Sequence, residues 1–346
     1  FLARDGRRLA ADLFTPDGTA RAQVIVHGAT AVPRGFYVPF ARFLARAGYQ
    51  TLIYDYRGVG GSALGSARED DATMTDWLTL DAPAAVRALR EQNPSVPLFA
   101  VGHSFGGQIA AALEGVPAPE AVVTLGAQRG YWATFPLAER PRLVLNWFVL
   151  LPFLTRALGY VPAKVGLGVD MPAGIVGEWA RWCRHPDYFL GDHPELRTRM
   201  ARYTGSLLAL SVSDDAFAPL ANVTWLYDLH EAAERQHVRF RPLDVGVTRV
   251  GHFGFVRALE AADRPIVPAV MSCANQREKA GADQQGYQQQ DQYQGEYAAE
   301  PGDQPDAGYD DGAPGQPSMN GMPPQGNAGY PPQDQGEPGL MKAGGH

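Results

Sequence analysis

One short stretch, Gly102–Gly106, constrains the fold most. It reads Gly-His-Ser-Phe-Gly and directly follows the apolar run Leu98–Val101. A serine with glycines two positions before and after it, between a strand and a helix, is typical of a nucleophile elbow, a turn too tight for large neighbours. Gly107–Leu113 supplies the helix. A glycine-rich loop with a solvated serine is the alternative, but the flanking strand and helix favour the elbow, with Ser104 Oγ above the end of a sheet.

A serine hydroxyl needs a base and an acid that orients the base. An elbow of this type predicts the chain order serine, acid, histidine. The apolar run Ser206–Ser213 reads as a buried strand and ends at two carboxylates before Pro219. We predict Asp215 as the acid and keep Asp214 as the alternative. A carboxylate here can also cap the helix that begins near Pro219, and Asp214 fits that role better.

His252 is the predicted base. It lies in a glycine-flanked loop, Gly251–Phe255, and has the expected place after the acid. His103 lies inside the elbow and is expected to face away from the serine. The remaining histidines lack this combination of a Gly-flanked loop and chain order: they are His27, His185, His193, His230, His237 and His346.

An oxyanion hole needs two backbone N–H groups aimed at the developing negative charge. The amide after the nucleophile, that of Phe105, is the first predicted donor. The second is expected in the loop His27–Thr30, after the apolar run Gln23–Val26. We assign it to Ala29 and keep Thr30 as the alternative.

These motifs resemble the α/β-hydrolase superfamily. Asp55–Ser62 is similar to that family's D-x-R-G-x-G-x-S loop, in which we expect Asp55 and Arg57 to brace loops. The chain resembles more narrowly a bacterial group near the serine aminopeptidase-like and lysophospholipase-like enzymes, over residues 1 to about 260. The resemblance implies the fold and a hydrolase reaction, and says little about the substrate. Stretches that carry it are Pro33–Tyr37, Trp179–Tyr188 and Gly251–Phe255.

The apolar pattern independently predicts an α/β fold. Several expected strands are nearly continuous apolar runs, which is typical of a parallel sheet covered on both faces, and helical patterns alternate with them. We therefore expect a mostly parallel, doubly wound core over 1–126 and 205–265. The expected strands are Leu9–Phe14, Gln23–Val26, Thr51–Tyr56, Leu98–Val101, Ala121–Leu125, Ser206–Val212 and Val238–Leu243; the expected helices are Tyr37–Ala47, Thr75–Gln92, Phe105–Leu113 and Pro219–Ala233.

The alternation stops over 127–204, an aromatic, proline-punctuated segment that we predict to be a cap over the site. Its most apolar stretch, Leu143–Leu154, is too short to span a bilayer and is expected to be a buried cap helix. A membrane-touching lid is the less favoured alternative, because interfacial helices need a polar face rich in Lys or Arg, whereas Arg140 and Arg142 lie beside the stretch and not on a face of it. Histidines and aspartates near 184–193 match no metal-ligand spacing, so we expect a hydrogen-bonded loop there, with no metal and no cofactor.

Composition changes near Asn275. Residues 275–346 are rich in Gln, Gly, Pro and Tyr and poor in large apolar side chains, which predicts a disordered tail with no partner that we can name. This segment holds three basic and eleven acidic side chains, a net charge of −8, against −7 for the whole chain. The remainder is therefore close to neutral, without the basic stripe that nucleic-acid binding requires.

Cys183 and Cys273 are the only two cysteines, so we expect no disulfide framework. No signal peptide is visible, although the chain begins at Phe1 without a methionine; a cytoplasmic location is the default prediction, and an N-terminal segment could have been removed. We expect a serine hydrolase that cleaves a carboxylic ester of a small acyl substrate, without membrane contact. Amide or peptide hydrolysis, acyl transfer, and a scaffold acting through its tail stay as alternatives.

Overall fold

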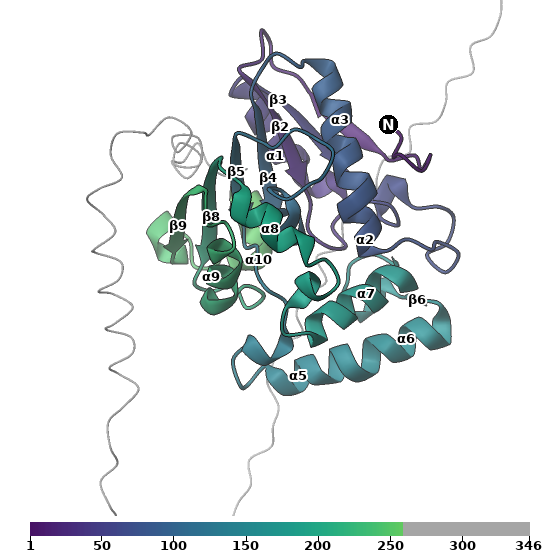
Figure 1. Cartoon of the computed structure of the whole chain (residues 1–346). Helices are drawn as coiled ribbons and strands as arrows, with labels where there is room; N and C mark the ends of the chain where they lie inside the picture. The colour runs from purple at the N-terminus through teal and green to yellow at the C-terminus, as the bar shows by residue number, and fades with distance from the viewer. Residues whose placement is uncertain (259–346) are drawn as a thin grey trace, which may run out of the picture. The chain divides into compact units, whose positions relative to one another are not determined.

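A seven-stranded sheet, in the order β1-β3-β2-β4-β5-β8-β9, forms the centre of the fold (Figure 1). The computed structural model describes residues 1–258, which belong to one compact unit. β1 is antiparallel to β3, and the other neighbouring strands are parallel. The predicted mostly parallel sheet is confirmed. The strands are β1 (Ala11–Phe14), β2 (Ala22–His27), β3 (Tyr49–Tyr54), β4 (Leu98–His103), β5 (Ala121–Leu125), β8 (Ser206–Val212) and β9 (Glu234–Phe240).

Successive residues of the central strands face opposite sides of the sheet, as strand geometry requires. Ile25 packs in the same buried cluster as Val86 of α3 (Ala82–Gln92), whereas Val24 and Val26 pack with Leu44 of α1 (Val38–Arg46). Both faces are therefore covered by helices, which explains why the parallel strands read as continuous apolar runs.

The remaining helices of the core lie between these strands, except α10, which follows β9. The expected helix over 75–92 contains a π-helical turn at Trp77–Asp81, and the helix after the elbow ends at Ile109, earlier than expected. The expected strand over 238–243 was placed too late, because β9 is an edge strand whose first residues are polar and partly exposed. The helices are α2 (Met74–Asp76), α4 (Phe105–Ile109), α9 (Leu220–Asp228) and α10 (Gly251–Ala258).

Residues 127–204, here called the insertion, connect β5 to β8. Its first helix is continuous from Arg140 to Leu158 through a π-helical turn, and α7 lies between α6 and the core (Figure 1). Within the stretch Leu143–Leu154, only Leu143 and Leu151 are fully buried. The prediction of a buried helix was wrong, because one face packs on α7 while the other is exposed. The elements are α5 (Arg140–Val144), the turn Leu145–Leu150, α6 (Leu151–Leu158), β6 (Tyr160–Val161), β7 (Met171–Pro172), α7 (Ala173–Arg184) and α8 (Glu195–Arg202).

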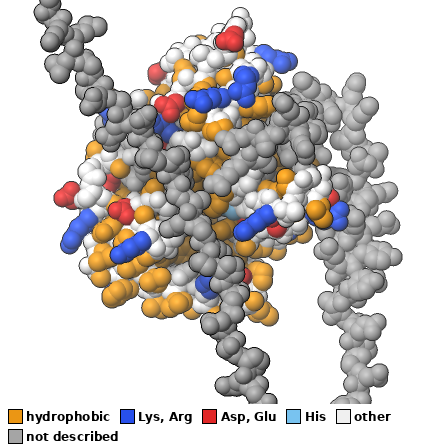
Figure 2. Space-filling model, turned by 180° about the vertical axis from the view of Figure 1, so that it is seen from behind, with side chains coloured by type: hydrophobic (Ala, Val, Ile, Leu, Met, Phe, Trp, Pro, Cys, Tyr) orange, Lys and Arg blue, Asp and Glu red, His pale blue; other side chains and the backbone are white. Residues whose placement is uncertain are grey.

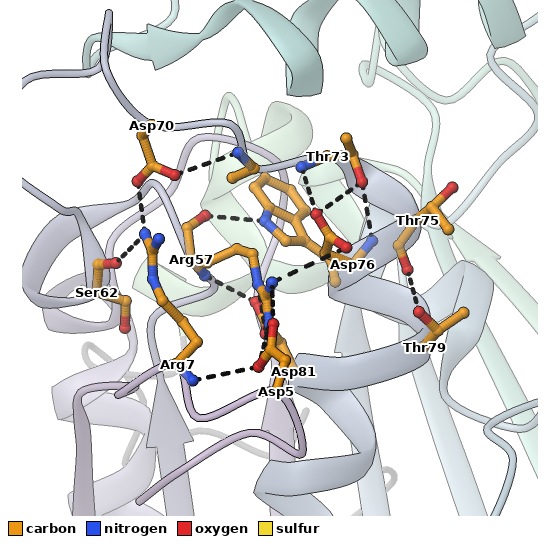
Figure 3. Close-up of polar contacts among 12 residues, drawn as sticks. Asp5, Arg7, Arg57, Ser62, Asp70, Thr73, Thr75, Asp76, Thr79 and Asp81 are labelled. Atoms are coloured by element: carbon orange, nitrogen blue, oxygen red, sulfur yellow. Dashed lines mark hydrogen bonds and ion pairs between the residues drawn. The ribbon is translucent and has the colours of Figure 1, made fainter.

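Buried ion pairs hold the loop after β3 in place (Figure 3). The Arg57 side chain donates to Asp81 and Asp5, and its backbone N–H donates to Asp81 Oδ2 at 2.8 Å. Trp77 Nε1 donates to the Arg57 carbonyl at 2.9 Å. Although burial opposes the charge, the carboxylates of Asp81 and Asp5 raise the pKa of Arg57. The loop is thus fixed to the π-helical turn Trp77–Asp81 and to the N-terminal residues.

Three sequence predictions lie outside the described residues: the disordered tail over 275–346, the end of the core near residue 265, and Cys273. Cys183 is buried in α7 and is a free thiol.

Candidate active site

Ser104 occupies a strained turn between β4 and α4. Its φ of 52° and ψ of −115° lie in a region that non-glycine residues rarely adopt. The turn requires its glycines: a Cβ at Gly106 would lie 2.1 Å from the His27 carbonyl oxygen, and one at Gly102 would lie 2.4 Å from Gly107. The strand–turn–helix geometry of a nucleophile elbow is therefore present at the predicted residue.

Asp215 and His252 form a buried pair at the carboxyl ends of the parallel strands. His252 Nδ1 lies 2.8 Å from Asp215 Oδ2, and both side chains are almost fully shielded from solvent. Asp215 Oδ1 accepts the amides of Phe217 and Ala218 at 2.8 and 3.1 Å. One carboxylate oxygen thus fixes the acid to its own loop while the other orients the imidazole.

The Asp214 side chain binds the backbone of the loop that precedes His252. Its carboxylate accepts the amides of Val250 and Gly251 at 2.9 and 3.0 Å. The expectation that Asp214 caps the helix near Pro219 was wrong, because its side chain points to the loop before His252. The two neighbouring aspartates therefore have different contacts: Asp214 binds the loop before His252, and Asp215 contacts the His252 imidazole.

Ser104 and His252 are brought to the same place by β5. The Ser104 amide donates to the Leu125 carbonyl at 2.9 Å. The next residue, Gly126, lies against the acid–histidine pair: a Cβ there would be 3.0 Å from Asp215 Oδ2 and 3.2 Å from His252 Nδ1. The described hydrogen bonds include none between Ser104 Oγ and the His252 ring. Such bonds often tighten only when substrate binds, and the engagement of Nδ1 leaves Nε2 for the hydroxyl.

A buried hydrogen-bond chain connects the early loop, the elbow and the histidine loop. His103 Nε2 lies 3.0 Å from the His252 carbonyl, His103 Nδ1 lies 2.9 Å from Tyr37 Oη, and the Ala29 amide donates to Tyr37 Oη at 2.8 Å. A carbonyl can only accept, so His103 carries its proton on Nε2 and accepts from Tyr37 on Nδ1. Burial lowers the pKa of His103 to about 3, which agrees with a neutral ring.

The two predicted oxyanion donors differ in availability. The Phe105 amide is at the start of α4, and the described hydrogen bonds give it no partner. The Ala29 amide is engaged by Tyr37, so Tyr37 Oη must release it before it can hold an oxyanion. This engagement argues against Ala29 in the arrangement described. Thr30, the alternative, has no hydrogen bond to its amide among the described contacts.

Residues 18–168 match the model of the family described as serine aminopeptidase, S33. This match covers less than half of the chain. Together with the parallel sheet and the elbow, it identifies the fold: the chain has the α/β-hydrolase fold. No curated protein matches it.

Solved structures have the same fold at low sequence identity. A soluble variant of monoglyceride lipase from Saccharomyces cerevisiae, in complex with a substrate analog, is 12% identical, with a TM-score of 0.54 over 74% of this chain and 91% of that one. An esterase from Exiguobacterium antarcticum is 17% identical, with a TM-score of 0.50 over 78% and 98%. The mostly parallel α/β-hydrolase fold expected from the motifs is thereby confirmed.

Two residues at the candidate site were missed by the sequence argument. Gly126 carries a signal that could have been used, because a glycine directly after a core strand often marks a close approach. Tyr37 carries none, since a tyrosine before a helix reads as ordinary core. The loop over 184–193 is hydrogen-bonded as predicted, with the Asp192 carboxylate accepting from Arg181 and Trp182.

Proposed function

We propose that this protein is a serine hydrolase that cleaves carboxylic esters through an acyl-enzyme formed on Ser104. The observation that carries the proposal is the buried Asp215–His252 pair, held at 2.8 Å next to the strained serine. A serine turn, an oriented imidazole and a free amide at a helix start are the parts that acyl transfer needs. An esterase and a monoglyceride lipase among solved structures of the same fold support the choice of an ester.

In the proposed reaction, His252 Nε2 takes the Ser104 proton as Oγ attacks the carbonyl carbon. Asp215 stabilises the imidazolium through Nδ1–H. The amide of Phe105, with a second donor from the His27–Thr30 loop, holds the negative oxygen. His252 then gives its proton to the departing alcohol oxygen. Water attacks the acyl-enzyme with His252 again as base, the carboxylic acid leaves, and Ser104 regains its proton.

The charges of the insertion favour a neutral ester over a peptide with a free amino terminus. An aminopeptidase needs a carboxylate for the substrate ammonium. The insertion has ten basic and six acidic side chains, a net charge of +4. Five of the six already contact a cation or an N–H group of this chain, and Glu195 lies 3.4 Å from His193 Nδ1; the five are Glu139, Asp170, Glu178, Asp187 and Asp192.

Apolar side chains around His252 suit a small acyl substrate. Phe217 and Phe253 are both exposed, and their ring centroids lie 5.1 and 5.2 Å from that of His252. We propose that these rings form part of the acyl contact surface and that the insertion acts as the cap. A cytoplasmic location remains a prediction from sequence.

Ser104→Ala tests the proposal. We expect p-nitrophenyl ester hydrolysis to fall by about 10⁴-fold or more, because the nucleophilic hydroxyl is lost and no acyl-enzyme can form. The thermal unfolding midpoint should stay near that of the wild type. A fluorophosphonate should label the wild type and not the variant. Ser66→Ala, at an exposed serine, is the matched control. Hydrolysis retained by a folded Ser104→Ala protein would refute the assignment.

The same substrates separate the remaining alternatives. Faster turnover of an aminoacyl amide than of the matching ester would favour the aminopeptidase, and ester formation with an added alcohol in place of hydrolysis would favour acyl transfer. A scaffold would show neither labelling nor turnover, since it has no need to activate its serine.

A further inference from the structure

The long first helix of the insertion presents an apolar face to solvent. Leu145, Val149 and Phe153 are 55%, 55% and 63% exposed, and Phe148 beside them is 45% exposed. In Figure 2, hydrophobic side chains gather along the lower edge, where Figure 1 places α5 and α6, with Lys or Arg side chains beside them. Soluble monomers rarely expose contiguous patches of this kind without a function.

These side chains follow the periodicity of one helix face. Arg142, Leu145, Val149, Phe153 and Arg156 are spaced by three or four residues, which places them along one stripe. We call this stripe, together with Phe148, the outer stripe. The opposite face packs inward, where the Trp147 and Trp179 rings are 4.9 Å apart. The helix is therefore anchored to α7, and the outer stripe is free to contact something else.

Basic side chains predominate along the helix that carries the outer stripe. Residues 140–169 include four basic side chains and no Asp or Glu, and Arg184 lies over the Phe148 ring at 5.6 Å. Glu139, just before this range, pairs with Arg142 at 2.6 Å. An apolar centre with arginines at both ends complements a surface in which a negatively charged outer layer covers an apolar interior.

We propose that the outer stripe docks this protein on an anionic lipid surface, with the helix lying in the plane of the membrane. None of the helices in residues 1–258 is long and apolar enough to cross a membrane. The apolar side chains would enter the acyl boundary while the arginines contact lipid phosphates. The inference goes beyond the proposed ester hydrolysis and does not depend on it.

Two other occupants fit the stripe less well. In a two-fold dimer through this face, Arg142 of one copy would meet Arg156 of the other, so like charges would oppose at both ends. The acidic residues 275–346 complement the charge, but Leu340 is their one Leu, Ile, Val or Phe. Their other large apolar side chains are five Tyr and three Met, dispersed among Gln, Gly, Pro and Asp, so the sequence offers no continuous apolar face for the stripe.

The docking face is connected to the candidate site through one short segment. The Phe148 ring contacts Trp132 at 5.9 Å between centroids. Trp132 belongs to the segment that begins at Gly126, which lies against Asp215 and His252. Docking would therefore place the site near the lipid surface without a rearrangement of the core.

Flotation of the full chain with lipid vesicles tests the proposal. We expect binding to phosphatidylcholine vesicles that contain about 30% phosphatidylglycerol, weaker binding to pure phosphatidylcholine, and a decrease with added salt. The triple variant Leu145→Ser, Val149→Ser, Phe153→Ser should have a vesicle affinity at least about tenfold lower, because it loses three apolar side chains that would be buried in the lipid. The double variant Arg142→Gln, Arg156→Gln should have a vesicle affinity at least roughly fivefold lower, and its binding should depend much less on salt.

Controls separate docking from folding, catalysis and dimerisation. Leu243→Ser, at an exposed leucine outside the stripe, should bind like the wild type, and so should Ser104→Ala, whatever the fate of the proposed reaction. The double arginine variant keeps the test valid if the triple variant unfolds. A wild type that stays unbound on anionic vesicles overturns the proposal. A dimer in sedimentation that the triple variant abolishes, without vesicle binding, assigns the stripe to a second copy and also overturns it.

Discussion

Gly126 has a φ of 55°, and the space where its Cβ would lie is bounded by the His252 and Asp215 side chains. Gly126→Ala should therefore strain the backbone by about 1 kcal/mol and displace the imidazole. We expect kcat for an ester to fall about tenfold to 100-fold, with a small loss of unfolding free energy. Gly18→Ala, where the Cβ would meet nothing within 4 Å, is the control. Equal activities of the two variants would contradict this reading.

Tyr37 connects three segments through one hydroxyl. Tyr37→Phe leaves the buried Ala29 amide and His103 Nδ1 without their partner. We expect the free energy of unfolding in urea to fall by about 1–3 kcal/mol. Tyr49→Phe is the control, because its hydroxyl makes no hydrogen bond within the described residues. A Tyr37→Phe protein as stable as that control would show that the chain of hydrogen bonds contributes little.

The sequence was informative about residues wherever chemistry restricts the choice. Few residue types can serve as nucleophile, acid or base, so Ser104, Asp215 and His252 could be proposed from spacing and order. The structure places Asp215 against His252, and the catalytic roles stay a prediction. Tyr37 could not be found, because its role depends on which loops meet after folding. The separate task of Asp214 likewise depends on the direction of one side chain, and a sequence does not contain that direction.

At the scale of single elements, the brace around Arg57 supports the loop after β3. Asp81 is fully buried and bonds both the side chain and the backbone of Arg57. Asp81→Asn leaves a buried guanidinium without its main counter-charge, so we expect a loss of about 3–5 kcal/mol in unfolding free energy. Asp5, which pairs with the same guanidinium, is 39% exposed, and Asp5→Asn should cost about 1 kcal/mol or less. Urea unfolding of both variants checks the ranking, and equal losses would contradict it.

Strands were predicted better than the environment of helices. Each of the seven strands of the sheet overlaps a predicted one. The central strands were located well because a sheet covered on both faces leaves long apolar runs, whereas the edge strand β9 was placed too late. The run Leu143–Leu154 is equally apolar, yet most of it is not fully buried, since burial depends on whether a partner covers each face. Composition alone cannot separate an apolar helix inside a fold from one that faces outward.

At the scale of the whole molecule, three buried histidines connect stability to pH. Burial lowers the pKa of His27 and His103 to about 3 and that of His230 to about 4. The unfolded chain binds these protons near the ordinary pKa of 6.5, whereas the folded chain does not. The unfolded state therefore gains protons as the pH falls below about 6.5, and the folded state loses relative stability.

We expect the free energy of unfolding to be nearly independent of these three groups above about pH 7.5 and to fall as the pH decreases toward 5. Each histidine contributes a slope of up to about 1.4 kcal/mol per pH unit, so the three together give up to about 4 kcal/mol per unit near pH 5. Urea unfolding between pH 7.5 and 5.5 measures this range before most carboxylates take up protons. His230→Gln should reduce the slope by about one third, because it removes one of three similar contributions. A stability that stays constant or rises toward pH 5.5 would mean that these rings take up protons without unfolding, and the neutral His103 inferred between Tyr37 and His252 would then be wrong as well.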